Sequence, residues 1–449
     1  MNDHSHTNKA EFLEVSKRLD DLLTKQEIYW HQQSKVSWLK HGDKNAKFFH
    51  SKASQQRRSN FIKGIRDQHQ NWVEGIDDIA RVATNHFESI FSSSGCDQMD
   101  ECLNTVPHKV TLDILEVLSS EYSVEEVKTT LFHMGPTKAP RHDGMNALFY
   151  QKFWHIVGDD VTAAVLDFLN SSNMLPEINY THIVLIPKIK LLERISDYRP
   201  ISLCNVIYKI ISKVLTNRLK LIFLMVISPT QIAFVPGHLI TDNVLVVYET
   251  LHTIHGRRSG RRGSLALKLD INKTYDHVEW PFLMGIMSRL GLPESWIDRV
   301  MTCVTSPTFF VCINGKAYGT VRHCKGIRQG DPLSPYFFLL CAKGFSSLLA
   351  KAEEDRRIHG VAICKRAPNT LTYYLLMTNY YFVEQLRRRC RPLLRYYRHM
   401  QLHRGNALIL RNHRSTSIAI RMVIRGQKLR QHWELGRLTG LRLIWGYLP

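Results

Sequence analysis

The chain has 449 residues, nine cysteines and a formal net charge of +20. Its length allows two or three domains with a sizeable buried core. The cysteines are scattered without a CxxC pair, which argues against a zinc site or a disulfide scaffold and fits a reducing, intracellular setting. The N-terminus is polar and the longest apolar runs are short, so neither a signal peptide nor a membrane span is expected. The positive charge suits a polyanionic partner but does not identify any chemistry.

Residues 1 to about 95 are predicted to form charged helices. Clearer signals of helix boundaries begin at Ser123. The segment Ser123-Val-Glu-Glu126 has the spacing of a capping box, and Gly135-Pro136 ends the helix that follows. A buried strand is predicted over Thr181–Pro187 and an amphipathic helix over Val206–Leu224. Four basic side chains are expected on the outer face of that second helix: Lys209, Lys213, Arg218 and Lys220.

The segment from Ser264 to Trp280 contains the first candidate site residues. Three leucines alternate with other residues over 265–269, a period of two that predicts a strand with one buried face. Asp270 ends this strand, and Asp276 precedes a helix expected from Pro281 to Gly291. An aspartate at the end of a buried strand suits Mg²⁺, which prefers oxygen ligands. On these residues alone, a strand end and a helix cap are the simpler interpretation.

A second informative stretch is the turn Gly326-Ile-Arg-Gln-Gly-Asp-Pro-Leu-Ser-Pro335. Ser334 is the expected N-cap of the next helix, with Pro335 in its first turn. The glycines beside Arg328 and Gln329 allow the backbone to approach a ligand closely. One side of the helix is predicted to be buried through Phe337, Phe338, Cys341, Phe345, Leu348 and Leu349.

Together, Leu269-Asp-Ile-Asn-Lys-Thr-Tyr-Asp276 and this turn resemble motifs A and B of reverse transcriptases, and most of all those of plant LINE-type (non-LTR) retrotransposons. Further motifs follow the family's order over residues 25–368: Trp38–His50, Lys138–Gly144, Leu185–Lys188, Asp197–Asn205 and Gln231–Gly237. The resemblance implies an α+β fold, with the fingers and palm of a right-hand polymerase and an antiparallel palm sheet. We expect a helical N-terminal extension over 1–95, fingers and palm over 108–368, and a separate tail over 369–449.

The resemblance also implies an RNA-directed DNA polymerase that uses Mg²⁺ ions, an RNA template, a DNA primer and dNTPs, without a membrane. Asp270 matches the first motif A aspartate, which is the catalytic metal ligand. Tyr275 matches the bulky residue that closes the sugar pocket, and Asp276 matches the second motif A aspartate.

The remaining matches concern the nucleotide. Arg328, Gln329 and Gly330 lie in motif B, at the nucleotide pocket of the family. Lys188 and Arg199 match positions where the fingers hold the template and the triphosphate, whose negative charge a cation would neutralise. Arg199 is the stronger candidate of these two, because a lysine on a protein surface is common.

The family also carries an aspartate pair, motif C, which is expected shortly after Pro368 and is absent here. No aspartate follows Asp355, and Glu384 and Glu434 are the remaining acids. If residues 371–385 are read from the third base of the Thr370 codon, one permitted translation is Thr-His-Leu-Leu-Phe-Ala-Asp-Asp-Lys-Leu-Leu-Phe-Cys-Arg-Ala, the expected motif with its flanks. We infer that the reading frame slips between Pro368 and Thr370.

The composition of the tail agrees with this interpretation. Residues 383–449 hold fourteen Arg and one Lys against two Glu, which is +13 of the net +20. An RNA-binding arm is an alternative explanation, but translation out of frame explains the bias better. We therefore expect a poorly ordered tail, a missing or garbled catalytic hairpin and thumb, and an inactive polymerase. The alternative function is a remnant that binds RNA without catalysis.

Overall fold

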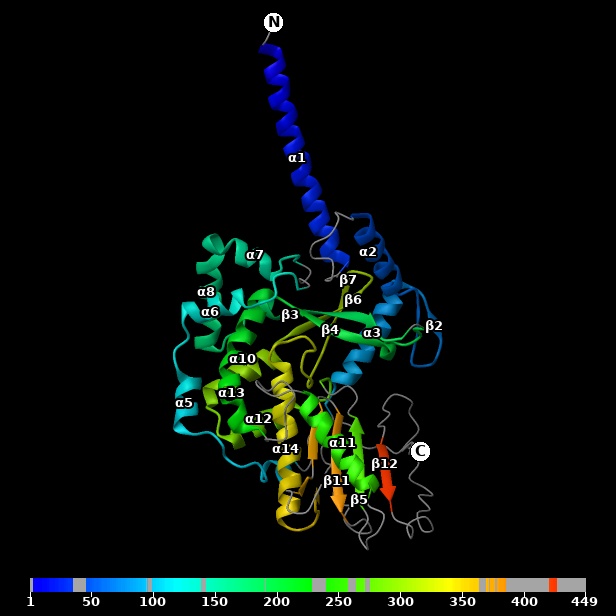
Figure 1. Cartoon of the computed structure of the whole chain (residues 1–449), viewed down its shortest axis with the longest axis vertical. Coiled ribbons are helices and arrows are strands. Elements are labelled where there is room, and N and C mark those ends of the chain that lie inside the picture. The colour runs from blue at the N-terminus through cyan, green and yellow to red at the C-terminus, as the bar shows by residue number, and fades with distance from the viewer. Residues whose placement is uncertain are drawn as a thin grey trace. The chain divides into compact units, whose positions relative to one another are not determined.

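The computed structural model describes residues 3–34, 46–93, 95, 99–138, 143–189, 191–227, 240–256, 264–270, 275–362, 369–370, 372–375, 378–384 and 420–425 (Figure 1). The chain divides into two compact units. The first unit comprises residues 1–79, 185–199 and 312–316, and the second comprises 80–184, 200–311 and 317–449. Among the described residues, no helix is long and apolar enough to cross a membrane.

The first unit begins with two helices, α1 (Asp3–Ser34) and α2 (Ala46–Asn60), as predicted for a helical N-terminal region. A short antiparallel hairpin follows, formed by β1 (Ile65–Arg66) and β2 (Trp72–Val73). The Asn314 side chain accepts a hydrogen bond from Ile62 N at 2.8 Å and donates one to Ile62 O at 2.9 Å. The first unit is thus held together by contacts between residues far apart in the sequence.

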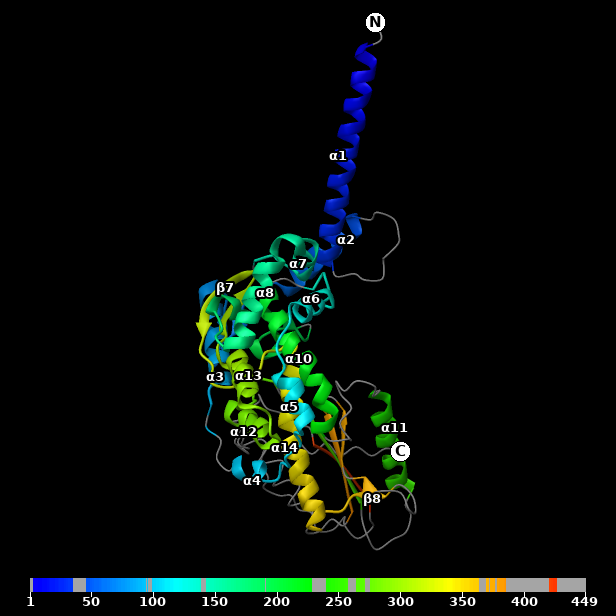
Figure 2. The same cartoon turned by 90° about the vertical axis from the view of Figure 1, so that its left-hand side faces the viewer.

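The second unit contains most of the helices and most of the buried core (Figure 2). Its central helix is α10 (Val206–Val226), whose Ile210, Ile211 and Val214 are fully buried. The other helices are α3 (Ile76–Phe91), which starts in the first unit, α4 (Met99–Leu103), α5 (Leu112–Ser119), α6 (Val124–Phe132), α7 (Ala147–Lys152), α8 (Trp154–Ser171), α9 (Pro176–Asn179), α11 (Ile240–Gly256), α12 (Trp280–Leu290), α13 (Glu294–Thr305) and α14 (Ser334–Glu354).

The predicted helix signals are confirmed with small shifts. The Ser123 hydroxyl accepts a hydrogen bond from Glu126 N and caps α6, and α12 ends at Gly291 with a φ of 91°. Helix α14 starts one residue earlier than expected, with Leu333 at its N-cap. The prediction that Arg218 faces outward is wrong, because its guanidinium is buried and its Nη2 lies 2.8 Å from Glu126 Oε2.

The described residues also form two four-stranded sheets. One sheet has the order β4-β3-β6-β7, from β3 (Tyr180–Pro187), β4 (Tyr198–Cys204), β6 (Thr308–Ile313) and β7 (Lys316–Val321). The other has the order β10-β11-β5-β12, from β5 (Ser264–Asp270), β10 (Thr372–Leu375), β11 (Thr378–Glu384) and β12 (Ile420–Arg425). All neighbours in this second sheet are antiparallel. The predicted mixture of helices and antiparallel sheet is confirmed.

That the catalytic hairpin is missing or garbled stays a prediction, although its segment forms strands. The backbone of a hairpin is present: β10 pairs with β11, and β11 pairs with β5 over its whole length. Strand β12 likewise pairs with β5, and β8 (Val361–Ala362) pairs with β9 (Asn369–Thr370). Tyr, Phe, Val and Thr dominate β10 and β11, and these residue types favour strands whichever reading frame supplied them.

Candidate active site

The strand β5 brings Asp270 to the centre of the second sheet. Asp270 pairs directly with Thr378, the first residue of β11, and Leu375 at the end of β10 pairs with the same Thr378. The side chains of β5, β10 and β11 lie outside the described residues, but the backbone register is defined. Asp270 is therefore adjacent to the first residue of β11. That residue directly follows the two residues that connect β10 to β11.

The backbone register defines which residue lies opposite Asp270. Two hard cations need several anionic oxygens, and the register puts neutral Thr378 opposite Asp270. Among the side chains that the structure describes, which do not include that of Asp270, no group of three or more His, Cys, Asp or Glu could hold a metal ion. The two residues between β10 and β11 in the sequence, Leu376 and Met377, have no carboxylate either.

The turn of motif B is shaped by two glycines. Gly326 and Gly330 have φ values of 93° and 114°, which a residue with a side chain rarely adopts. A Cβ on Gly330 would lie 3.1 Å from Ser202 O, and Ser202 N donates to Gln329 O at 2.8 Å. The turn therefore lies directly against β4, as expected where the backbone must approach a neighbour closely.

Motif A and motif B are joined by backbone hydrogen bonds. Gly326 N donates to Val278 O at 2.7 Å, and Ile327 N donates to Tyr275 O at 2.8 Å. The indole of Trp280 donates to Gly326 O at 2.8 Å. Tyr275 is half-buried, with its ring 6.1 Å from that of Phe338 on α14, and burial raises the pKa of its hydroxyl. The predicted sugar-pocket residue is thus fixed to the turn that carries Gln329.

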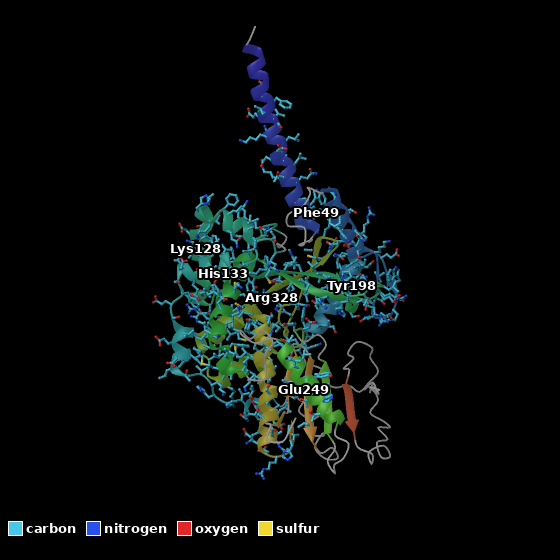
Figure 3. The ribbon with its side chains drawn as sticks, viewed as in Figure 1. Phe49, Lys128, His133, Tyr198, Glu249 and Arg328 are labelled. Carbon is cyan, nitrogen blue, oxygen red and sulfur yellow. The ribbon has the colours of Figure 1, made fainter. Side chains whose placement is uncertain are left out.

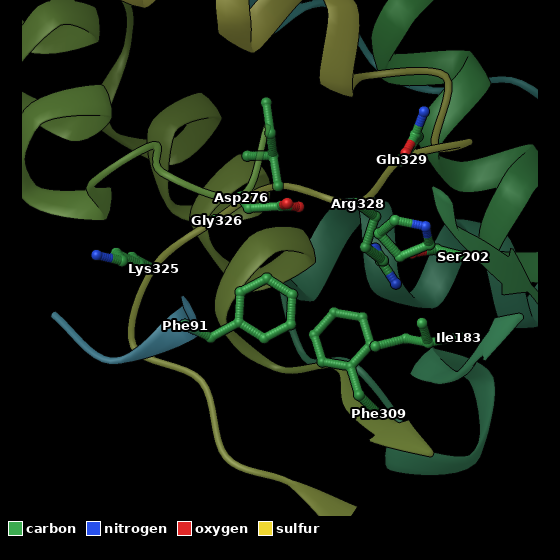
Figure 4. Close-up of a pocket in the computed structure, with 11 residues that line it drawn as sticks. Phe91, Ile183, Ser202, Asp276, Phe309, Lys325, Gly326, Arg328 and Gln329 are labelled. Carbon is green, nitrogen blue, oxygen red and sulfur yellow. The ribbon is translucent and has the colours of Figure 1, made fainter. Parts of the chain in front are cut away.

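A shallow pocket open to solvent lies between these two motifs, with a cavity volume of about 20 Å³ (Figure 4). The rings of Phe91 and Phe309 lie on one side of it, stacked with centroids 5.7 Å apart. Asp276, Arg328 and Gln329 are the predicted site residues that line it. The pocket thus combines an apolar side with a polar side, as small-molecule sites commonly do.

Arg328 (Figure 3) is 5% exposed, and its guanidinium binds protein acceptors. Its Nη1 donates to Asn179 Oδ1 and Thr181 Oγ1 at 2.5 and 3.2 Å, and its Nη2 donates to Cys303 O at 2.8 Å. Nη2 also lies 3.1 Å from Asp331 Oδ2. The guanidinium is therefore largely occupied within the protein.

Asp331 is the centre of the same network, and sequence reasoning missed it. It accepts hydrogen bonds from the hydroxyls of Tyr208 and Ser212 on α10 and from Leu333 N at 3.0 Å. Burial raises the pKa of Tyr208 well above its usual range, so this hydroxyl stays protonated and can donate. The opposite charges at Arg328 and Asp331, three residues apart in an apolar stretch, are the sequence signal that could have revealed the pair.

The structure places the two finger cations in the first unit. Lys188 is exposed, with Nζ donating to Ser196 O at 3.0 Å, and Arg199 is exposed on β4. Their action on a nucleotide at the pocket of the second unit stays a prediction. The predicted motifs over 139–142 and 231–237 lie outside the described residues.

Comparison with known proteins agrees with these motifs. Residues 186–365 match the family model described as reverse transcriptase (RNA-dependent DNA polymerase). The chain is 27% identical over 349 residues to the transposon TX1 uncharacterized 149 kDa protein of Xenopus laevis, covering 76% of this chain and 26% of that protein. It is 28% identical over 166 residues to the Pol polyprotein of the retrotransposable element R2 of Popillia japonica, covering 35% of this chain and 22% of that protein.

A shorter match concerns a plant protein. An uncharacterized mitochondrial protein of Arabidopsis thaliana is 45% identical over 56 residues, which is 12% of this chain and 46% of that protein. The chain spans about a quarter of the length of the transposon proteins TX1 and R2 that it matches. From the matched residues and the order of its motifs, the chain contains the reverse transcriptase domain of a non-LTR (LINE-type) retrotransposon.

Proposed function

We propose that this reverse transcriptase domain does not catalyse DNA synthesis as its sequence stands, because the metal site lacks two of its three carboxylates. The observation that carries the proposal is the pairing of Asp270 with Thr378, a neutral residue. Two divalent cations bring four positive charges, and one carboxylate cannot hold them close together against their mutual repulsion. Loss of these ligands removes the main electrostatic stabilisation of phosphoryl transfer.

A slip of the reading frame accounts for the loss. The family match ends at residue 365, just before the inferred slip between Pro368 and Thr370. In the shifted reading, the aspartate pair falls at positions 377 and 378, and position 378 is the one opposite Asp270. The inference of a plant element is supported by the short, 45% identical match to the Arabidopsis protein.

In the ancestral reaction, the incoming dNTP would lie against the residues that line this shallow pocket. Tyr275 would close on the sugar, Asp276, Gln329 and Gly330 would line the nucleotide, and Lys188 and Arg199 would neutralise the triphosphate. For Arg328 we propose a positioning role, because its guanidinium is buried and bound to protein acceptors. It fixes the turn that carries Gln329 and Gly330.

Primer extension on the purified chain tests the proposal. With an RNA template, a DNA primer, dNTPs and Mg²⁺, we expect no incorporation above a sample without protein. If the chain incorporated dNTPs and an Asp270→Asn variant did not, the chain would still have the family's catalytic activity, and the proposal would be wrong.

RNA binding without catalysis is the second candidate function, and α2 favours it. This helix has no acidic residue, and Lys52, Arg57 and Arg58 are exposed on it. Lys63 and the ring of Phe61, 53% exposed, follow directly. Exposed cations next to an exposed aromatic ring suit a single-stranded nucleic acid, through phosphate contacts and base stacking.

Replacing Lys52, Arg57 and Arg58 by alanine is expected to weaken RNA binding in a gel-shift titration. The slope of log affinity against log salt should fall by about 2, since each phosphate contact on a single strand contributes roughly 0.7. The matched control replaces three exposed cations in the last turn of α14 and just after it, Lys351, Arg356 and Arg357, and changes the net charge equally. Equal losses in both triple variants would mean that α2 has no special role.

A further inference from the structure

A second buried ion pair lies beside the pocket, formed by Glu279 and Lys325. The two residues are 1% and 4% exposed, and Lys325 Nζ lies 3.6 Å from Glu279 Oε1. Their backbones also form an isolated antiparallel bridge. Burial raises the pKa of Glu279, whereas the Ser93 hydroxyl and the Lys325 ammonium favour its charged form. Removing two charges from water is costly unless they are paired, so each depends on the other.

Three segments meet at this pair. Glu279 is the N-cap residue of α12, and the Ser93 hydroxyl, two residues after α3, donates to Glu279 Oε2 at 2.7 Å. Cys324 N, next to Lys325, donates to Phe91 O at the end of α3 at 2.9 Å. The pair therefore ties the end of α3 and the start of α12 to the strand that enters motif B.

The backbone on either side of the pair forms the pocket. Val278 O and Tyr275 O accept the hydrogen bonds from Gly326 N and Ile327 N. A Cβ on Gly326 would lie 3.1 Å from Asp276 O, so a residue with a side chain at this position would be crowded against the Asp276 backbone. Any loosening of Glu279 from Lys325 would therefore first change the distance between Tyr275 and the Gln329 turn.

We propose that Glu279 and Lys325 are positioning residues that set the spacing between the Tyr275 segment and the turn of motif B. This inference rests on the proposed function, in which Tyr275 closes on the sugar and Gln329 lines the nucleotide. Lys325 is itself among the residues that line the pocket. The ion pair acts through the backbone hydrogen bonds of Gly326 and Ile327, and so determines the width of the sugar pocket.

Amide hydrogen exchange on the full chain tests the proposal without nucleotide or metal, so an inactive chain does not affect the result. In Glu279→Gln and Lys325→Met variants, the amides of Gly326 and Ile327 should exchange at least about tenfold faster, because local openings have their own free energies. Peptides from α10, in the same unit, serve as the internal reference, and their exchange rates should not change. Lys325→Arg keeps the charge and should restore slow exchange.

Two further variants make the result decisive. Ser93→Ala removes one hydrogen bond from Glu279 at an exposed position, so it keeps the fold and should accelerate the same two amides by a smaller factor. Lys351→Met breaks an exposed ion pair with Glu354 and should leave the exchange rates of both amides unchanged. The proposal is overturned if Gly326 and Ile327 exchange normally in all three destabilising variants, if α10 accelerates equally, or if Lys325→Arg fails to restore protection.

Discussion

A chain carrying Met377→Asp and Thr378→Asp is expected to bind Mn²⁺, used as a spectroscopic substitute for Mg²⁺, at least about tenfold more tightly than the unaltered chain, because metal affinity rises with ligand charge. The reason lies in the backbone register, which the structure retains. Residue 378 is directly opposite Asp270, and residues paired in this way have Cβ atoms about 4.5–5.5 Å apart. Carboxylates at that separation can share a cation. Titration of Mn²⁺ followed by electron paramagnetic resonance measures the change.

The matched control carries Met377→Asn and Thr378→Asn, which have nearly the same size as the aspartates but no charge. It should bind Mn²⁺ as weakly as the unaltered chain. Adding Asp270→Asn to the aspartate pair should remove the gain in affinity. If both pairs of substitutions bind Mn²⁺ equally, the hairpin does not hold residue 378 near Asp270, and the explanation of the lost site is wrong.

Arg328→Met is expected to destabilise the second unit by about 3–5 kcal/mol, because it leaves Asp331 buried without its cation. Tyr208 and Ser212 would still donate to Asp331, but they cannot neutralise its charge. Urea denaturation followed by circular dichroism measures the apparent free energy of unfolding.

An exposed pair of the same residue types provides the control. Arg357 Nη2 lies 2.8 Å from Asp355 Oδ2, with both side chains more than a third exposed. Arg357→Met should cost less than about 1 kcal/mol, as for most exposed ion pairs. In a double variant, Arg328→Met with Asp331→Leu, the loss should be smaller than the sum of the two single losses, because no charge is then left buried. Additive losses would mean that the pair is not coupled.

Local patterns predicted much of the fold around the site. The alternation of leucines before Asp270 indicated β5, Ser123 indicated the start of α6, and Gly291 indicated the end of α12. Each of these signals depends on residues within one turn or strand. They are physical requirements of the local backbone, so they are readable without knowledge of the rest of the chain.

Long-range partners could not be predicted in the same way. Arg218 was placed on an outer helical face, and its partner Glu126 lies 92 residues away in the sequence. Arg328 was assigned to the nucleotide, whereas its acceptor Asn179 is 149 residues away. A periodic pattern gives the face of a helix but not the residue that packs on it, so buried polar networks escape it.

The β10–β11 hairpin shows that the loss of a sequence motif need not mean the loss of its backbone structure. The absence of aspartates predicts a missing or garbled catalytic hairpin, whereas strand formation depends on residue shape and packing more than on the acids at the turn. The Tyr- and Val-containing segment over 378–384 therefore pairs with β5 without the acids. The chemistry of the site can be lost while the backbone that positioned it remains.

The most direct test of this account is template-directed DNA synthesis, measured side by side for the unaltered chain and the chain with the aspartate pair at 377 and 378. The account predicts that the unaltered chain incorporates no dNTP at any Mg²⁺ concentration, even at protein concentrations that saturate the template. Mg²⁺-dependent incorporation by the unaltered chain, abolished by Asp270→Asn, would contradict it.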